Sequence, residues 1–199
     1  MSYKNVFGLV CLVALSAPSV AMPVVYSTTL SGPNESPVNA SPGTGTALVT
    51  IDDVLHSMRV QATFSGLTSA NTASHIHVIN GPGDANTSDT LGPVTTTTPT
   101  FTGFPGGVTS GVFDQTYDMT LASSYRSGFI TDAGGTTAAA EAALFSGIAQ
   151  GRAYLNIHTI NFAGGEIRGF LQPVPEPATL LLMGAGMAGL VVIRRRRRV

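Results

Sequence analysis

Apolar and polar residues alternate in short stretches over most of the chain between residues 22 and 173. In SMRVQATFSGL (57–67) every second residue is apolar, and similar runs are VVYSTTLSG, GTALVTIDD, ASHIHVIN, GVFDQTYDMTL, GRAYLNIHTI and GEIRGFLQP. Glycine, proline, asparagine and aspartate interrupt these runs. Alternation of this kind predicts short antiparallel strands that pack as an all-β sandwich or a Greek-key barrel.

Two segments depart from this pattern. TTAAAEAALFSGIAQG (136–151) has Ala140, Leu144 and Ile148 at helical spacing, a threonine that can cap its start and a glycine that stops it. We expect one short helix there, and a helical turn within 121–129. Residues 81–111 are rich in glycine, proline and threonine, and predict a long loop with an edge strand near Val94.

The N-terminus has the organisation of a secretory signal peptide. Lys4 precedes an apolar run over 6–15, and Ser19, Val20 and Ala21 provide the small residues of a cleavage site. We expect signal peptidase to cut after Ala21, so that 1–21 is the signal peptide and the protein is exported. The only cysteine, Cys11, lies within it, so the mature chain has no disulfide or thiol chemistry.

The C-terminus combines two prolines, an apolar run and a basic cluster. Pro175 and Pro177 precede 178–193, which carry no charge, and the cluster is Arg194, Arg195, Arg196, Arg197 and Arg198. A buried core helix is the alternative for a run this short, but five consecutive arginines do not pack into a core. We therefore predict a transmembrane helix over 178–193, with the ectodomain outside and the arginines anchoring the cytoplasmic end.

The domain between these ends is acidic. Residues 22–173 contain four arginines, no lysine and ten carboxylates, a net charge of −6 that the C-terminal arginines hide in the whole-chain value of −1. Such a surface argues against a nucleic-acid partner. The chain also lacks a Gly-x-Ser-x-Gly motif and a phosphate-binding glycine loop. We therefore expect a protein that is not an enzyme.

Three histidines pose the main chemical question. His75 and His77 alternate with apolar residues on one predicted strand, and His158 does so on another. One interpretation is that all three are solvated or hydrogen-bonded residues of a polar face. The other is a copper or zinc site between the sheet and the 81–111 loop, because neutral imidazoles are good ligands for both metals.

Glu166 and Arg168 are two positions apart on the last predicted strand, and therefore share a face. We expect a structural ion pair between them. The alternative is that Arg168 binds a ligand.

The C-terminal tail resembles a PEP-CTERM sorting signal. The resemblance covers 174–199: Val174, Pro175, Glu176 and Pro177, then the apolar helix, then the arginines. It implies processing by an exosortase, a membrane-embedded enzyme of bacteria that make exopolysaccharide. The expected destination is the cell surface or the extracellular matrix, with exopolysaccharide as a candidate partner.

The ectodomain, over 22–173, is similar to the CHRD domain. The resemblance rests on LSGPNESPVNASPGTGTALVTID, ASHIHVINGPG and GRAYLNIHTINFAGGEIRGFLQP. It implies an immunoglobulin-like or superoxide-dismutase-like β-sandwich and no agreed enzymatic activity. The His-x-His pair also resembles the copper-binding pair of copper/zinc superoxide dismutases, although a bridging histidine and a disulfide are missing. We expect a non-enzymatic exported module. The alternative is a copper- or zinc-binding protein, with or without a redox function.

Overall fold

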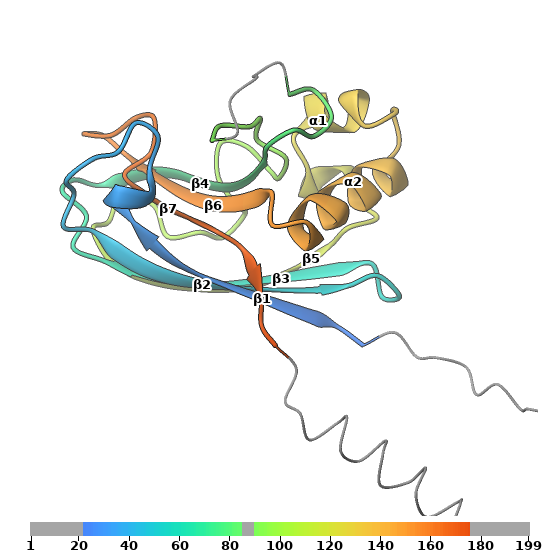
Figure 1. The fold of residues 1–199 in the computed structure, drawn as a ribbon, viewed down its shortest axis with the longest axis horizontal. Coiled ribbons are helices and arrows are strands. Elements are labelled where there is room, and N and C mark those ends of the chain that lie inside the picture. Colours follow the sequence, from blue (N-terminus) through green and yellow to red (C-terminus); the bar gives the residue numbers. More distant parts are fainter. Residues whose placement is uncertain (1–21, 85–89, 176–199) are drawn as a thin grey trace, which may run out of the picture.

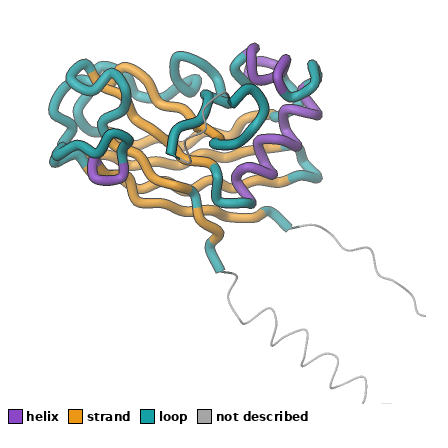
Figure 2. Tube along the Cα trace, turned by 45° about the horizontal axis from the view of Figure 1, so that its top comes forward, coloured by secondary structure: helices purple, strands orange, loops and turns teal. Residues whose placement is uncertain are grey.

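The computed structural model describes residues 22–84 and 90–175, and most of its regular structure is β (Figures 1 and 2). The strands are β1 (Val24–Ser31), β2 (Thr44–Asp52), β3 (Ser57–Ser65), β4 (Asn71–Val78), β5 (Gly111–Asp118), β6 (Ala153–Thr159), β7 (Ile167–Phe170) and β8 (Gln172–Pro173). The helical elements are η1 (Gly32–Asn34), η2 (Ala122–Ser124), α1 (Ser127–Asp132) and α2 (Thr137–Ala149).

All strand pairs are antiparallel and belong to one sheet. Its order is β4-β6-β7-β1-β2-β3-β5, and β8 also pairs with β1. The sheet curls, so that β4, β6 and β7 form one layer over β1, β2, β3 and β5 (Figure 1). The predicted all-β antiparallel fold is confirmed, with the two layers formed by a single continuous sheet.

The core lies between the two layers and follows the alternation in the sequence. On β3, Met58 and Val60 are fully buried while Arg59 between them is exposed. Ile76, Leu155 and Ile167 from the opposite layer are equally buried. Because side chains alternate across a strand, a shift by one residue would expose this whole set to water, and the burial therefore fixes the register.

The predicted helix is confirmed as α2. Thr136 caps it by accepting a hydrogen bond at Oγ1 from the amide of Ala139 (3.2 Å). Ala140, Leu144 and Ile148 form its fully buried side, which packs on the core. The helical turn expected within 121–129 is present as η2 and the start of α1.

The long connection between β4 and β5 covers the edge of β4. The amide of Phe101 donates to the carbonyl of Ser74 (2.9 Å), and the ring of Phe101 is buried in the core. The edge strand expected near Val94 is reduced to isolated bridges, in which Val94 pairs with His77. The connection thus lies over the strand that carries two of the candidate histidines.

Several predicted features lie outside the described residues. These are the signal peptide (1–21), Glu176 and Pro177 of the sorting motif, the helix over 178–193 and the arginine cluster. Among the residues that are described, no helix is both long and apolar enough to cross a lipid bilayer.

Candidate metal centre

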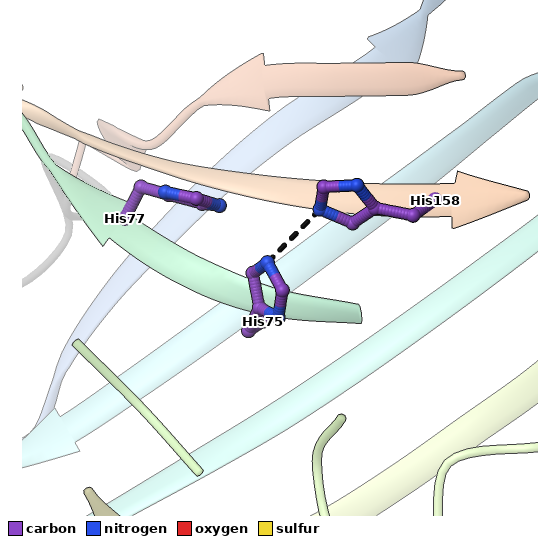
Figure 3. Close-up of side chains that lie close together, drawn as sticks. All are labelled: His75, His77 and His158. Atoms are coloured by element: carbon purple, nitrogen blue, oxygen red, sulfur yellow. Dashed lines mark hydrogen bonds between the residues drawn. The ribbon is translucent and has the colours of Figure 1, made fainter. Parts of the chain in front are cut away.

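The three candidate histidines converge at one point. β4 and β6 pair so that His75 lies opposite Asn156, and His158 lies opposite Ala73, two positions from His75. His75, His77 and His158 therefore share a face of neighbouring strands, and their rings point toward one another (Figure 3). One ring nitrogen from each lies within 4.8 Å of the other two.

The site lies beneath the loop, out of bulk solvent. His75 is 6% and His77 is 9% exposed, although both project from the polar side of β4. The β4–β5 connection covers them, as its hydrogen bonds to both residues show. His158 is half-buried. The interpretation as polar-face residues therefore holds only in its hydrogen-bonded form, and it stands beside the interpretation as a metal site.

Each histidine is oriented by a backbone carbonyl at its Nδ1 atom. His75 contacts the oxygen of Pro99 (2.9 Å), His77 that of Gly92 (2.7 Å) and His158 that of Ala163 (2.9 Å). A carbonyl oxygen only accepts, so Nδ1 carries the hydrogen and, in the neutral ring, Nε2 carries the lone pair. Carbonyls have no side-chain signature, so these contacts were invisible in the sequence.

The Nε2 atoms are left facing one another. Those of His75 and His158 are 2.9 Å apart, which is the dashed contact in Figure 3. The Nε2 atom of His77 is buried without a hydrogen-bond partner among the described residues. Three neutral rings would thus direct their lone pairs at a shared point, where the lone pairs repel one another. A proton removes part of this repulsion, and a metal cation bound by all three nitrogens removes all of it.

The surroundings keep the rings neutral. Burial, reinforced by the neighbouring histidines, lowers the pKa of His75 to about 4 and that of His77 to about 3. Burial also lowers the pKa of His158. The free imidazole, which is the form that binds a metal, therefore predominates at neutral pH.

The donor set suits zinc or copper. All three donors are neutral nitrogens, whereas calcium and magnesium require oxygen ligands. Nitrogens that bind a tetrahedral zinc at 2.0–2.1 Å are about 3.3 Å apart. The observed separations, 2.9 Å for one pair and at most 4.8 Å overall, bracket this value.

A second layer of side chains packs behind His77. The ring of Tyr154 stacks on the imidazole of His77 (centroids 4.7 Å apart, planes at 6°), and the guanidinium of Arg168 lies 4.7 Å from the Tyr154 ring centre. Arg168 donates to the carbonyls of Asn34 and Thr90, both at 2.6 Å. Arg168 thus joins β7 to two loops and holds Tyr154 against the site.

The expected ion pair between Glu166 and Arg168 is wrong. The acidic partner of Arg168 among the described residues is Glu35, with Nε 3.6 Å from the carboxylate. Glu166 instead accepts hydrogen bonds from the hydroxyls of Ser41 (2.6 Å) and Thr159 (2.6 Å) and from the amide of Thr68 (2.7 Å). Glu166 directly follows Gly165 (φ +130°) and precedes β7, and its side chain reaches a different set of loops from that of Arg168.

The side chains of Glu35 and Asn156 are buried beside this layer. Their side-chain ends both lie against Gly165, where the absence of a side chain leaves room for them. Among the described residues, Glu35 Oε1 and Asn156 Oδ1 are buried without a hydrogen-bond partner. Burial, opposed by Arg168, raises the pKa of Glu35 to about 7.

The fourth histidine, His56, lies outside this cluster. His56 is the last residue of the β2–β3 turn, its side chain is 53% exposed, and its Nδ1 lies 2.9 Å from the carboxylate of Glu141 on α2. It links the hairpin to the helix and serves as a natural control for the other three.

Comparison with protein families agrees with this architecture. The CHRD domain model matches residues 26–171, and the PEP-CTERM protein-sorting motif matches residues 173–198. No curated protein and no solved structure matches the chain significantly. The sorting motif indicates an exported protein directed to the cell surface and processed by an exosortase. Since the first match spans most of the chain, including all three histidines of the site, the protein belongs to the CHRD domain family.

Proposed function

We propose that this chain is an exported, exosortase-sorted protein whose CHRD domain binds one zinc or copper ion through His75, His77 and His158. The observation that carries the proposal is the convergence of three Nε2 atoms whose Nδ1 atoms are all held by backbone carbonyls. A second layer that fixes ring orientation is typical of protein metal sites. The domain holds the metal without catalysing a reaction.

Metal titration tests this proposal directly. Calorimetric titration of the protein with zinc, and separately with copper, is expected to give one site per chain. His77→Ala removes one of three ligands and should abolish tight binding, whereas His56→Ala should leave it unchanged, because His56 lies outside the cluster. Equal binding by the wild-type protein and His77→Ala, or no binding by either, contradicts the proposal.

The destination of the protein is a separate part of the proposal. The predicted signal peptide and the sorting motif support a precursor that crosses the inner membrane once through 178–193, with Arg194–Arg198 inside, and that is later released to the cell surface or exopolysaccharide. Replacement of the five arginines by serine should impair retention and processing, because positive residues hold a membrane segment in orientation. Unchanged location and processing of this variant, followed by immunoblotting of cell fractions, would contradict it.

A further inference from the structure

The folded domain ends where the sorting motif begins. The motif match starts at residue 173, within β8, and β8 is paired with β1. The amide of Val174 donates to the carbonyl of Val25 (2.8 Å). If the tail is inserted in a membrane, as the proposed function holds, only the three residues Pro175, Glu176 and Pro177 lie between Val174 and the predicted span.

Exposed apolar side chains gather at the end of the domain where the chain enters and leaves. Of twelve exposed large hydrophobic residues in the described parts of the chain, six lie here, and we call them the exit surface: Met22 (60% exposed), Val24 (41%), Val54 (58%), Leu55 (73%), Leu121 (52%) and Val174 (41%). Scattered apolar residues are ordinary on protein surfaces, but a cluster of them marks a contact site.

Strand pairing places these residues together. Val24 lies opposite Ile51, at the end of β2 from which the turn carrying Val54 and Leu55 begins. The turn continues to His56, whose carbonyl accepts from the amide of Met119, two residues before Leu121. A shallow groove lined by Met22, Val24 and Phe145, among others, borders the same surface.

The turn is built to present its apolar side chains outward. The carboxylate of Asp52 accepts hydrogen bonds from the amides of Val54 (3.0 Å) and Leu55 (2.9 Å). This fixes the backbone of the turn and leaves both side chains in solvent. Asp118 is likewise engaged, by the amide and hydroxyl of Thr120 (2.9 and 2.6 Å).

We propose that the exit surface rests on the lipid bilayer in which the sorting tail is anchored. The short connection places this surface next to the membrane, and its side chains suit the boundary between headgroups and acyl chains. Asp52, Asp53 and Asp118 surround the apolar residues, so the contact favours zwitterionic over anionic lipid. On zwitterionic lipid the contact is apolar in origin and therefore insensitive to salt.

The absence of tryptophan from the chain allows a site-specific test. Leu55→Trp and Val112→Trp each introduce one indole at positions of similar exposure, 73% and 76%. Val112 lies at the far end of β5, opposite Thr63, whereas the exit end of β5 pairs with Ser57. The full chain carrying either change is reconstituted into phosphatidylcholine vesicles with brominated acyl chains, and tryptophan fluorescence is measured.

We expect brominated lipid to quench Leu55→Trp several-fold more strongly than Val112→Trp, with a blue shift only in the former. Flotation of the protein with the vesicles reports tail insertion separately. Flotation with equally weak quenching of both variants overturns the surface contact and leaves the anchored tail standing, while loss of flotation overturns both. A blue shift that depends on protein concentration and not on lipid overturns the proposal in favour of contact with a second copy.

Discussion

The Nε2 atoms of His75 and His158 lie 2.9 Å apart, although the two residues are 83 positions apart in the chain. Both rings already donate at Nδ1 to backbone carbonyls, so in their neutral forms two lone pairs face each other. Such a contact is favourable only with a proton or a metal ion between the nitrogens. The predictions for the site follow from this relationship.

Zinc should stabilise the fold. A ligand that binds only the native state adds about 2.7 kcal/mol at a hundred times its Kd, which for a domain of this size is roughly 5–10 °C in Tm. Thermal denaturation with zinc and with excess chelator measures the shift. It should disappear in His158→Ala and persist in His56→Ala. An equal shift in both variants would show that zinc binds elsewhere.

Gly92→Ala should weaken metal binding without altering a ligand. A Cβ at Gly92 would collide with the backbone of Val78, so the segment must move, and with it the carbonyl that holds Nδ1 of His77. Loss of such a contact typically lowers affinity about 10–100-fold.

Gly106→Ala is the matched control, since a Cβ there meets no atom within 4 Å in the same long connection. We expect its zinc affinity, measured by competition with a chelating dye, to equal that of the wild-type protein. Unchanged affinity in Gly92→Ala would mean that the carbonyl does not orient His77.

Glu35 should make stability fall as pH rises. The pKa of its carboxyl is raised from 4.5 to about 7, so in this window the folded state keeps a proton that the unfolded state has lost. Compared with Glu35→Gln, the wild-type protein should lose on the order of 1–3 kcal/mol of unfolding free energy as the pH rises from about 4.5 through the folded-state pKa of about 7, and the difference should level off about one pH unit above it.

Urea denaturation of both metal-free proteins across this range measures the difference. The titrations of the histidines occur in both proteins and cancel in the comparison. A difference that is constant with pH would show that Glu35 is ionised throughout.

Glu166→Ala should be strongly destabilising. It removes the acceptor of buried hydrogen bonds from Ser41, Thr68 and Thr159, and leaves their donors without partners. We expect a loss of about 3 kcal/mol or more, measured by urea denaturation. Asp114→Ala removes an equally well-formed contact, to Arg59, from an exposed part of the sheet, and should change stability little. Similar losses in the two variants would contradict the structural role of Glu166.

Much of the fold was predictable from the sequence because it depends on local patterns. Alternation places every second residue of β3 in the core, and helical spacing with a threonine cap produces α2. Alternation also predicts that His75 and His77 share one face of β4, and that Tyr154 and His158 share the polar face of β6. These features are set by backbone geometry within a few residues, which a single strand or helix already contains.

Only the tertiary structure determines which segments pack against those strand faces. The pairing of β4 with β6 joins the three histidines, and the long connection buries them and supplies the carbonyls of Gly92 and Pro99. The tertiary structure also pairs Arg168 with Glu35, a residue 133 positions away, whereas the sequence pattern predicted an ion pair with Glu166. Spacing along a strand determines which side a residue faces. Its partner depends on which segments pack against that side, and this is fixed only when the whole core forms.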